Sequence, residues 1–394
     1  MNVSSSILRF SYGVLRSIAP TVKVGNVVVL SRYDQVKEVL NNGYLYRAPY
    51  LENLKTLCGD APDFILGMDP GSSYNEQRKL FMDQVRSQDI TNFIPDLAST
   101  EVKKLIGNGG EIEVVAMVRR AASRTLLAYF GIGENLADET LSEYEDLALS
   151  IFKYQFMDDG TDTEKKEKAK LQGQRLFDLI EQQILMAKQS SFSNDNLLGR
   201  YLSAAEGSPV LSDKLISTAL FGFIVGGLPQ PSMVVPNALN ELIHRPHALK
   251  MAMDAAETND AQLEAIFFEA LRFDPLAPML KRTVVENTVL SAGTSRERKL
   301  VTGDKLIVMF ASAMQDHRRV ENPRSFNPNR PKSSYMHFGF GHHECFATAI
   351  NRKMLPAMIK PLLIRNSLTR ADGKKGRLKK VEVAFPESLY LNVA

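Results

Sequence analysis

The chain has 394 residues, of which 44% are hydrophobic and 24% are charged, with 24 Gly and 18 Pro. This composition is that of an ordinary folded protein and excludes disordered, collagen-like and fibrous classes. The net charge of +3 arises from 48 basic and 45 acidic residues and gives no reason to expect a nucleic-acid binder. The two cysteines, Cys58 and Cys345, are too few for a disulfide framework or a Cys-rich zinc module, and they suit a reducing cytoplasm.

The sequence predicts neither a signal peptide nor a membrane anchor. Arg9 and Arg16 interrupt the apolar residues of the N-terminus, and no small-residue cleavage site follows them. The uncharged stretch 215–240 is long enough to span a bilayer, but it contains three prolines and several Gln, Ser and Asn residues. We therefore predict a buried helix beside a cofactor rather than a membrane span.

Hydrophobic periodicity and turn residues predict a mostly helical chain. In chain order, the predicted elements are a strand pair at 22–24 and 27–31, helices at 32–41, at 72–85 and through most of 94–202, helices at 212–243 and 260–273, strands at 283–285, 288–290, 300–301 and 305–310, a loop at 322–331, a helix at 346–366, and strands at 381–384 and 389–393. Ser72 or Ser73 is expected to cap the second helix. The charged run 161–170 is interpreted as a solvated face rather than a binding patch.

These elements predict a mainly α protein with small β-sheets, of the α+β class. We find no internal repeat and no clear linker, so a single large domain over residues 1–394 is predicted. A domain of this size can bury a core that encloses a cofactor.

The strongest local signal is the segment 338–345, with the sequence FGFGHHEC. Gly339 and Gly341 permit a tight turn whose backbone lies close to a flat ligand. Cys345 follows at the predicted start of a helix, where backbone N–H groups and the helix dipole stabilise a thiolate that can bind a soft metal or haem iron. His343 lies close enough in sequence to bind an anionic group of the same cofactor.

Two other interpretations of this loop remain open at this point. In the first interpretation, Cys345 is a buried free thiol. A zinc ion bound by His342, His343 and Cys345 is the second, although the spacings of structural zinc sites are absent and adjacent histidines rarely point the same way.

The segment resembles the haem loop of the cytochrome P450 family, which has the pattern Phe-Gly-x-Gly-x-His/Arg-x-Cys-x-Gly. Phe338, Gly339 and Cys345 match this pattern, and Ala347 replaces the last glycine. The resemblance implies the P450 fold, a single large domain around a buried haem b whose iron is bound by Cys345.

Other motifs of the family occur in the same order along the chain. Glu269 and Arg272 match the Glu-x-x-Arg motif, which is structural in the family, and their spacing places them on one helical face as an ion pair. The segment 326–330 resembles the meander, whose arginine, here Arg330, meets that pair.

The resemblance also implies which residues bind the two haem propionates. Arg282 lies where the family offers an arginine to a propionate, and His343 is expected to assist. Arg78 keeps the arginine of the family's C helix, whereas Tyr74 replaces its histidine. A tyrosine hydroxyl can still donate to a carboxylate.

One segment departs from the family pattern. The distal helix of the family usually contains Ala/Gly-Gly-x-Asp/Glu-Thr, whose acid and alcohol organise water and deliver protons during dioxygen activation. Here Gly226 and Gly227 remain, but Pro229 replaces the acid and Gln230 replaces the alcohol. No Asp or Glu occurs between positions 214 and 241.

This substitution has two physical consequences. Pro229 lacks the N–H of a helical residue, and its ring clashes with the carbonyl of Val225. Together these effects cost about 3 kcal/mol in a regular helix. The freed carbonyls must bond to water, to a ligand or to a side chain. Gln230 can orient water or an oxygen atom, but it cannot act as a general acid. The alternative is that Gln230 only caps a freed carbonyl of the helix. Gly226, Gly227 and Gln230 are therefore the candidate catalytic residues.

Three functions remain open. The first is an O2-dependent monooxygenase that acts on a small organic substrate, specialised-metabolite or lipid-like, with protons supplied by ordered water or by the substrate. The second is a P450 that uses a peroxide or rearranges a hydroperoxide, because family branches of this kind lack the acid–alcohol pair. The third is a haem protein that is not an enzyme and acts as a recruiter or sensor.

The resemblance to soluble bacterial members implies a cytoplasmic protein served by a ferredoxin and a ferredoxin reductase, with no nucleic-acid partner and no membrane anchor. Lys332, Arg352 and Lys353 are candidates to face an acidic ferredoxin, or they form an ordinary solvated face. Phe223 and Met279 line the substrate pocket or belong to the core.

Overall fold

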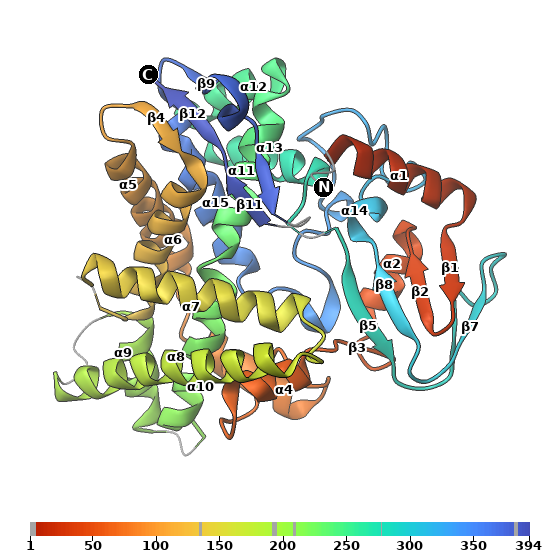
Figure 1. Ribbon diagram of the computed structural model, residues 1–394, viewed down its shortest axis with the longest axis horizontal. Coiled ribbons are helices and arrows are strands. Elements are labelled where there is room, and N and C mark those ends of the chain that lie inside the picture. The colour runs from red at the N-terminus through yellow and green to blue at the C-terminus, as the bar shows by residue number, and fades with distance from the viewer. Residues whose placement is uncertain (1–4, 134–135, 191–194, 208–209, 277, 382–384) are drawn as a thin grey trace. The chain divides into compact units, whose positions relative to one another are not determined.

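The structure is a computed structural model that describes residues 5–133, 136–190, 195–207, 210–276, 278–381 and 385–394. Over these residues the chain is mostly helical with small sheets, which confirms the predicted mainly α architecture (Figure 1). Its internal contacts form two compact units, each assembled from separate stretches of chain. The first unit comprises Met1–Pro49, Ile106–Ala116 and Met233–Ala394, and the second comprises Tyr50–Leu105 and Met117–Ser232. A single domain over 1–394 stays a prediction.

The first unit contains the sheets. Its largest sheet has the order β1-β2-β8-β5-β3, built from Thr21–Val24, Val27–Leu30, Lys305–Val308, Leu280–Val284 and Tyr46–Arg47. A second sheet has the order β4-β12-β9, built from Gly110–Glu113, Tyr390–Val393 and Leu368–Arg370. Two hairpins complete the set, β6-β7 at Thr288–Leu290 and Arg298–Leu300 and β10-β11 at Lys379–Val381 and Phe385–Ser388.

The helices of the first unit pack on and beside these sheets. They are α1 (Ser5–Ile18), α2 (Tyr33–Asn41), α12 (Pro246–Thr258), α13 (Asp260–Phe273), α14 (Phe310–Ala313), α15 (Thr348–Leu363) and most of α11 (Gln230–Ile243). Strand β2 runs parallel to β8 and β5 runs antiparallel to it, so Val28 and Arg282 are both in register with Leu306. Val28, Val36 and Leu306 belong to one buried apolar cluster that fixes α2 against this sheet.

The second unit is helical. Its helices are α3 (Leu51–Cys58), α4 (Ser72–Met82), α5 (Ile94–Ile106), α6 (Val114–Phe130), α7 (Asp138–Met157), α8 (Thr163–Gln189), α9 (Leu197–Ala205) and α10 (Asp213–Gly227), with a π-helical turn at Asp89–Phe93. Helices α7 and α8 lie side by side (Figure 1). The rings of Phe177 and Phe221 stack with centroids 4.5 Å apart, which joins α8 to α10.

Most predicted elements are present, with local corrections. Helix α4 ends at Met82, and Gly71 rather than Ser72 or Ser73 is its N-cap, so no serine caps it. The charged run 161–170 is exposed except for Ala169, which confirms a solvated face. Of the strand predicted at 381–384, residues 382–384 lie outside the described residues.

The helix predicted over 212–243 is broken in two. Helix α10 ends at Gly227 and α11 begins at Gln230, so Pro229 lies in the break. A break is expected there because proline has no N–H to donate within a helix. Among the described helices, the stretch Asp213–Ile243 is long and apolar enough to cross a membrane, but 72% of its most apolar window is buried within the protein. This burial is that of a core helix.

Candidate haem site

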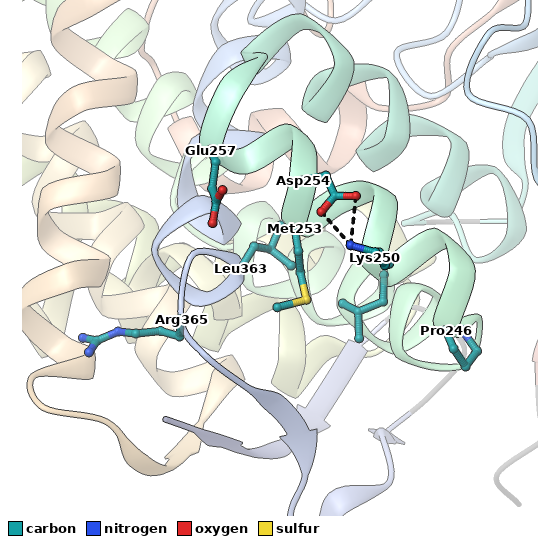
Figure 2. A pocket seen from close by; sticks show the side chains of 8 residues that line it. Pro246, Lys250, Met253, Asp254, Glu257, Leu363 and Arg365 are labelled. Carbon is teal, nitrogen blue, oxygen red and sulfur yellow. Dashed lines mark hydrogen bonds and ion pairs between the residues drawn. The ribbon is translucent and has the colours of Figure 1, made fainter.

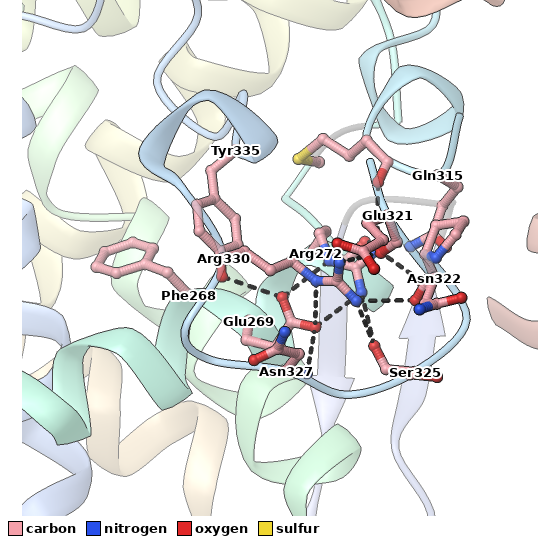
Figure 3. Close-up of polar contacts among 12 residues, drawn as sticks. Phe268, Glu269, Arg272, Gln315, Glu321, Asn322, Ser325, Asn327, Arg330 and Tyr335 are labelled. Carbon is pink, nitrogen blue, oxygen red and sulfur yellow. Dashed lines mark hydrogen bonds and ion pairs between the residues drawn. The ribbon is translucent and has the colours of Figure 1, made fainter. Parts of the chain in front are cut away.

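A buried carboxylate organises the helix that precedes the cysteine loop (Figure 3). Glu269 Oε2 and Oε1 accept hydrogen bonds from Arg272 Nε at 2.9 Å and Nη2 at 2.8 Å, and both side chains are fully buried. Arg330 Nε donates to Oε1 at 3.2 Å. The pair on α13 is therefore a core ion pair that meets the meander arginine, as the resemblance implies, and not a surface salt bridge.

Two further donors complete this cluster. The backbone N–H of Asn327 donates to Glu269 Oε1 at 2.9 Å, and the hydroxyl of Tyr335 donates to Oε2 at 3.1 Å. Burial, followed by the neighbouring Glu269 charge, raises the pKa of Tyr335, so its phenol stays protonated as a donor. Glu269 thus connects α13, the meander and the chain that enters the cysteine loop.

The cysteine loop is closed by its own backbone. The N–H of Cys345 donates to the carbonyl oxygen of Phe338 at 2.9 Å, and the ring of Phe338 packs edge-on against Phe268 of α13 with centroids 5.5 Å apart. Gly341 has φ +66°, and a Cβ there would lie 3.1 Å from the Cα of Asn41. Only glycine suits this point, because the loop turns in a left-handed conformation against the end of α2.

The helix after the loop begins later than predicted. Helix α15 starts at Thr348 with Ala347 as its N-cap, so Cys345 precedes the first turn. The Thr348 hydroxyl donates to the carbonyl oxygen of Cys345 at 2.7 Å, which holds the cysteine against the helix. The Cys345 side chain is half-buried.

Arg282 fits the predicted partner of a haem propionate. It points inward from β5 and is 4% exposed, and its Nη1 donates to the carbonyl of Lys281 at 2.8 Å. Within the described ranges of the chain, no carboxylate forms an ion pair with Arg282, and no hydrogen bond joins it to the cysteine loop. A buried guanidinium without a counter-charge is costly, so the residues present favour an anionic group of a cofactor.

Tyr74 and Arg78 lie together on α4 in the second unit. Arg78 Nη1 donates to the Tyr74 hydroxyl at 3.3 Å. Burial raises the pKa of Tyr74, and Arg78 opposes this shift, so the hydroxyl remains neutral and able to donate. The pair forms one positively charged donor group, as a propionate site requires.

The predicted catalytic residues lie at the break between α10 and α11, and they are less buried than the residues between them. Gly226, Gly227 and Gln230 are partly exposed, whereas Leu228 and Pro229 are buried. A Cβ at Gly226 would meet no atom within 4 Å, so open space adjoins the helix there, as close approach to a flat cofactor requires.

A serine beside the helix break bonds to the backbone there. The Ser232 hydroxyl donates to the carbonyl oxygen of Pro229 at 2.8 Å in a buried position. The Gln230 amide makes no hydrogen bond with any residue that the structure describes. The Gln230 amide thus caps no carbonyl of a described residue, and it is available to a ligand or to water.

The aromatic residue Phe223 belongs to a cluster in the second unit. Its ring lies 6.1 Å from Phe64, 5.8 Å from Phe81 and 6.1 Å from Phe130, measured between centroids. Met279 lies in the first unit and is 38% exposed. Phe223 thus packs with core aromatic residues, and Met279 is no core residue.

Two alternative sites find no support. No three His, Cys, Asp or Glu side chains converge as a metal site requires, among the residues with described positions, which disfavours zinc at the loop. A surface hollow of about 280 Å³ is lined by α12 and the end of α15, where Lys250 and Asp254 form an ion pair (Figure 2). None of the predicted site residues lines this hollow.

The predicted residues fall in both units. Arg282, Phe338, Gly339, His343 and Cys345 belong to the first, and Tyr74, Arg78, Gly226, Gly227 and Gln230 belong to the second. The structure joins Phe338 to Cys345 and Tyr74 to Arg78 directly. The rings of His343 and His342 meet edge to face with centroids 4.9 Å apart.

Sequence reasoning missed Tyr335 and His337. Tyr335 donates to Glu269, and the His337 ring stacks on Tyr335 with centroids 5.7 Å apart. Burial lowers the pKa of His337 to about 4, so the imidazole is neutral. The available signal was their position just before the loop, where Tyr335 and His337 alternate with Met336 and precede Phe338.

A half-buried cysteine in a closed glycine loop, a buried Glu-Arg-Arg cluster and an uncompensated arginine define a haem-thiolate protein. The cytochrome P450 family model matches residues 20–390, and the chain belongs to this family. It is an oxidoreductase with haem b as cofactor.

Two fungal relatives are distant in sequence. A bifunctional dioxygenase–epoxy alcohol synthase of Fusarium oxysporum is 22% identical over 386 residues, which cover 89% of this chain and 30% of that protein. Linoleate diol synthase of Gaeumannomyces graminis is 24% identical over 50% of this chain and 18% of its own length. The chain thus spans less than a third of these relatives. CYP109E1 of Bacillus megaterium, solved with corticosterone, superposes with a TM-score of 0.78 over 98% of this chain and 99% of that chain, at 19% identity.

Proposed function

We propose that this P450 uses an oxygen donor that is already at the oxidation level of a peroxide, namely a peroxide or an organic hydroperoxide. The observation on which this proposal rests is the Gln230 amide, which stands where the family has an alcohol and has no protein partner in the described chain. The thiolate-bound haem supplies the oxidising chemistry when bound. The chain's own residues decide which oxygen donor can be used.

A hydroperoxide removes the need for a proton relay. Rearrangement of a hydroperoxide to a diol breaks the O–O bond and one C–H bond. One oxygen stays on its carbon as a hydroxyl, the other forms a new C–O bond as a second hydroxyl, and the hydrogen of the C–H bond ends on one of these oxygens, so no reductant is consumed. Dioxygen use requires two electrons and two protons from outside. An amide is neutral at every working pH, and it can hold and orient an oxygen atom but cannot deliver a proton as a general acid.

The relatives support a lipid-like hydroperoxide as the substrate class. The Fusarium protein is named for epoxy alcohol synthesis and the Gaeumannomyces protein for linoleate diol synthesis. Because the chain spans only part of each, their activities support the proposal and do not define it. The apolar aromatic cluster around Phe223 is compatible with an acyl chain.

An O2-dependent monooxygenase served by ferredoxin and its reductase is the second candidate. The open space beside Gly226 favours it, because ordered water there would carry protons in place of the missing acid. The basic residues that are candidates to face a ferredoxin, Lys332, Arg352 and Lys353, give the monooxygenase less support. Arg352 and Lys353 both pair with Glu264, at 2.7 and 2.9 Å, which neutralises part of their charge. We further infer a cytoplasmic location, from the cysteine content.

Product analysis separates the two candidates. Haem-loaded protein is incubated with linoleic acid hydroperoxide or hydrogen peroxide and no reductant, beside linoleic acid with O2, NADPH, ferredoxin and ferredoxin reductase. Epoxy alcohol or diol products from the hydroperoxide alone support the proposal. Products only in the complete reducing mixture overturn it in favour of the monooxygenase.

A further inference from the structure

Helix α1 is attached to the first unit by its two arginines. Arg9 Nη1 donates to Glu241 Oε1 at 3.2 Å and to the carbonyl oxygen of Phe273 at 2.7 Å. Arg16 is 8% exposed, and its Nη1 donates to the carbonyl and hydroxyl oxygens of Ser312 at 2.7 and 2.8 Å. Ser312 belongs to α14, which lies beside α1 (Figure 1). Both charged side chains of α1 therefore point toward the protein.

The opposite face of α1 is apolar and exposed. Phe10 is 72% exposed, Val14 is 41% exposed and Ile18 is 79% exposed. Because these residues are four positions apart, they follow one ridge of the helix, with Phe10 and Ile18 about 40° to either side of Val14. Ser11 and Ser17 are the other exposed residues in the part of α1 whose side chains are described. A surface helix of a monomer normally has the reverse polarity, with charges toward water and apolar residues toward the core.

The sequence of this exposed face is symmetric about Val14. Phe10 and Ile18 lie four residues before and after it, and Ser11 and Ser17 lie three residues before and after it. In an antiparallel pair of helices with a two-fold axis at Val14, Phe10 of one copy would meet Ile18 of the other. Ridges of every fourth residue are those that pack most often between helices, and the small serines allow a close approach. The face is thus complementary to itself.

Covering this face removes no charge from water. Both arginines of α1 bind protein oxygens, and the sequence has no acidic residue before Asp34. A helix that lies on a membrane instead keeps Lys or Arg free to meet anionic headgroups. A charged protein surface would lose water and find no opposite charge on α1. An uncharged apolar face is the matching partner, and a second copy of this chain presents one.

We propose that α1 is a self-association surface, and that two copies pair through Phe10, Val14 and Ile18 around a two-fold axis at Val14. The surface belongs wholly to the first unit and does not depend on the proposed function. A standard interface buries about 800 Å² on each partner. Helix α1 has 14 residues and is about 21 Å long, so one face of it supplies only part of that area. The dimer should therefore be weak, with a Kd of about 10 μM.

Analytical ultracentrifugation of the haem-loaded protein tests the association. We expect a monomer at about 1 μM and mostly dimer at about 100 μM, as a Kd of about 10 μM requires. A monomer over the whole range overturns the proposal.

Substitutions locate the interface. Val14→Lys places a charge on the proposed axis at an exposed position, and it should weaken the association at least tenfold. Val301→Lys is the matched control, because it changes a valine of the same unit that is 50% exposed and lies outside α1. This control should associate like the wild type, and the reduced carbonyl spectrum checks that both variants hold haem. Equal association by Val14→Lys and the wild type would place the dimer on another face and overturn the proposal.

Cysteine substitutions in a Cys58→Ala background test the two-fold axis. Mild oxidation should link Val14→Cys to a second copy of itself, because the two residues face each other on the axis. Phe10→Cys should not link to itself, since antiparallel pairing separates the two copies of this residue by about 12 Å along the helices. A mixture of Phe10→Cys and Ile18→Cys should form linked dimer faster than either variant alone. Self-linkage of Phe10→Cys without that of Val14→Cys would contradict the proposed axis.

Vesicles distinguish a lipid surface from a second copy. Phosphatidylcholine vesicles with and without phosphatidic acid are sedimented with the wild type at about 1 μM, where it should be monomeric, and with Val14→Lys. We expect neither protein to bind the vesicles. Vesicle binding by the wild type that is lost in Val14→Lys would assign the exposed face of α1 to a membrane surface and overturn the proposal.

Discussion

His337 is hydrogen-bonded to the helix beneath the cysteine loop through the carbonyl oxygen of Phe268, 2.9 Å from its Nε2. Because a carbonyl only accepts, Nε2 must bear the proton. His337 directly precedes Phe338, whose own carbonyl accepts from Cys345. One side-chain hydrogen bond and one backbone hydrogen bond thus connect α13 to the proposed iron ligand.

Replacement of His337 by Phe should loosen the cysteine loop. The ring would still stack on Tyr335, but the hydrogen bond worth about 1 kcal/mol would be lost. We expect haem to dissociate roughly fivefold faster, with a smaller red-shifted Soret band in the reduced carbonyl complex. His337→Asn, which can still donate, should recover part of the band, and equal spectra for both variants would contradict this role.

The same histidine predicts a dependence of stability on pH. Its pKa is about 4 in the fold against an ordinary 6.5, so the unfolded chain binds a proton between these values and the native state does not. The free energy of unfolding should therefore fall as pH drops from 6.5 toward 4, by at most about 1.4 kcal/mol per pH unit. Urea unfolding at several pH values should show a shallower slope for His337→Phe, and identical slopes would refute the assignment.

Arg282 should be needed for haem and not for the fold. Arg282→Met removes a buried charge without a carboxylate partner, so the haem-free protein should keep or gain stability. Haem loss to an excess of a haem-scavenging protein should be about 10- to 100-fold faster than in the wild type. Arg298→Met is the control, and equal haem loss in the two variants would remove Arg282 from the propionate site.

Cys345→Ala should abolish the red-shifted Soret band of thiolate ligation in the reduced carbonyl complex. Cys58→Ala is the matched control, because burial raises the pKa of Cys58 to about 12 and keeps it a neutral thiol. We expect this control to keep the full band per protein. A thiolate spectrum in Cys345→Ala would assign the iron to another ligand.

Glu269→Ala should impair folding rather than catalysis. It would leave Arg272 and Arg330 buried without their shared carboxylate, at a cost of about 3–5 kcal/mol. We expect low soluble yield and poor haem content, with normal activity per bound haem in the fraction that folds. A well-folded variant with full haem content would show that the cluster is not structural.

Local sequence patterns predict most helices and strands, but they do not predict contacts between residues that are far apart in the sequence. Helix α13 has the predicted bounds, because Asn259 caps it by accepting from the N–H of Gln262 and apolar residues recur along it. The start of α15 was misplaced, since Thr348 bonds back to Cys345. No local pattern indicates that Tyr335 donates to Glu269 or that His337 bonds to Phe268, because these contacts join residues 66 and 69 positions apart.

Gln230→Ala should separate catalysis from stability, with Ser232→Ala as its partner. The Gln230 amide has no hydrogen-bonding partner among the described residues, so its loss should leave haem content and unfolding temperature unchanged. If the amide aligns the O–O bond, hydroperoxide turnover per haem should fall by roughly 10²–10³, by analogy with an oxyanion-hole donor. Ser232→Ala removes the hydrogen bond to the Pro229 carbonyl, so it should lose about 1 kcal/mol of stability and keep its rate per haem. In a monooxygenase, Gln230→Ala would instead reduce the coupling of NADPH oxidation to product formation and leave peroxide turnover intact. Unchanged peroxide turnover and unchanged coupling would together show that Gln230 has no part in the reaction.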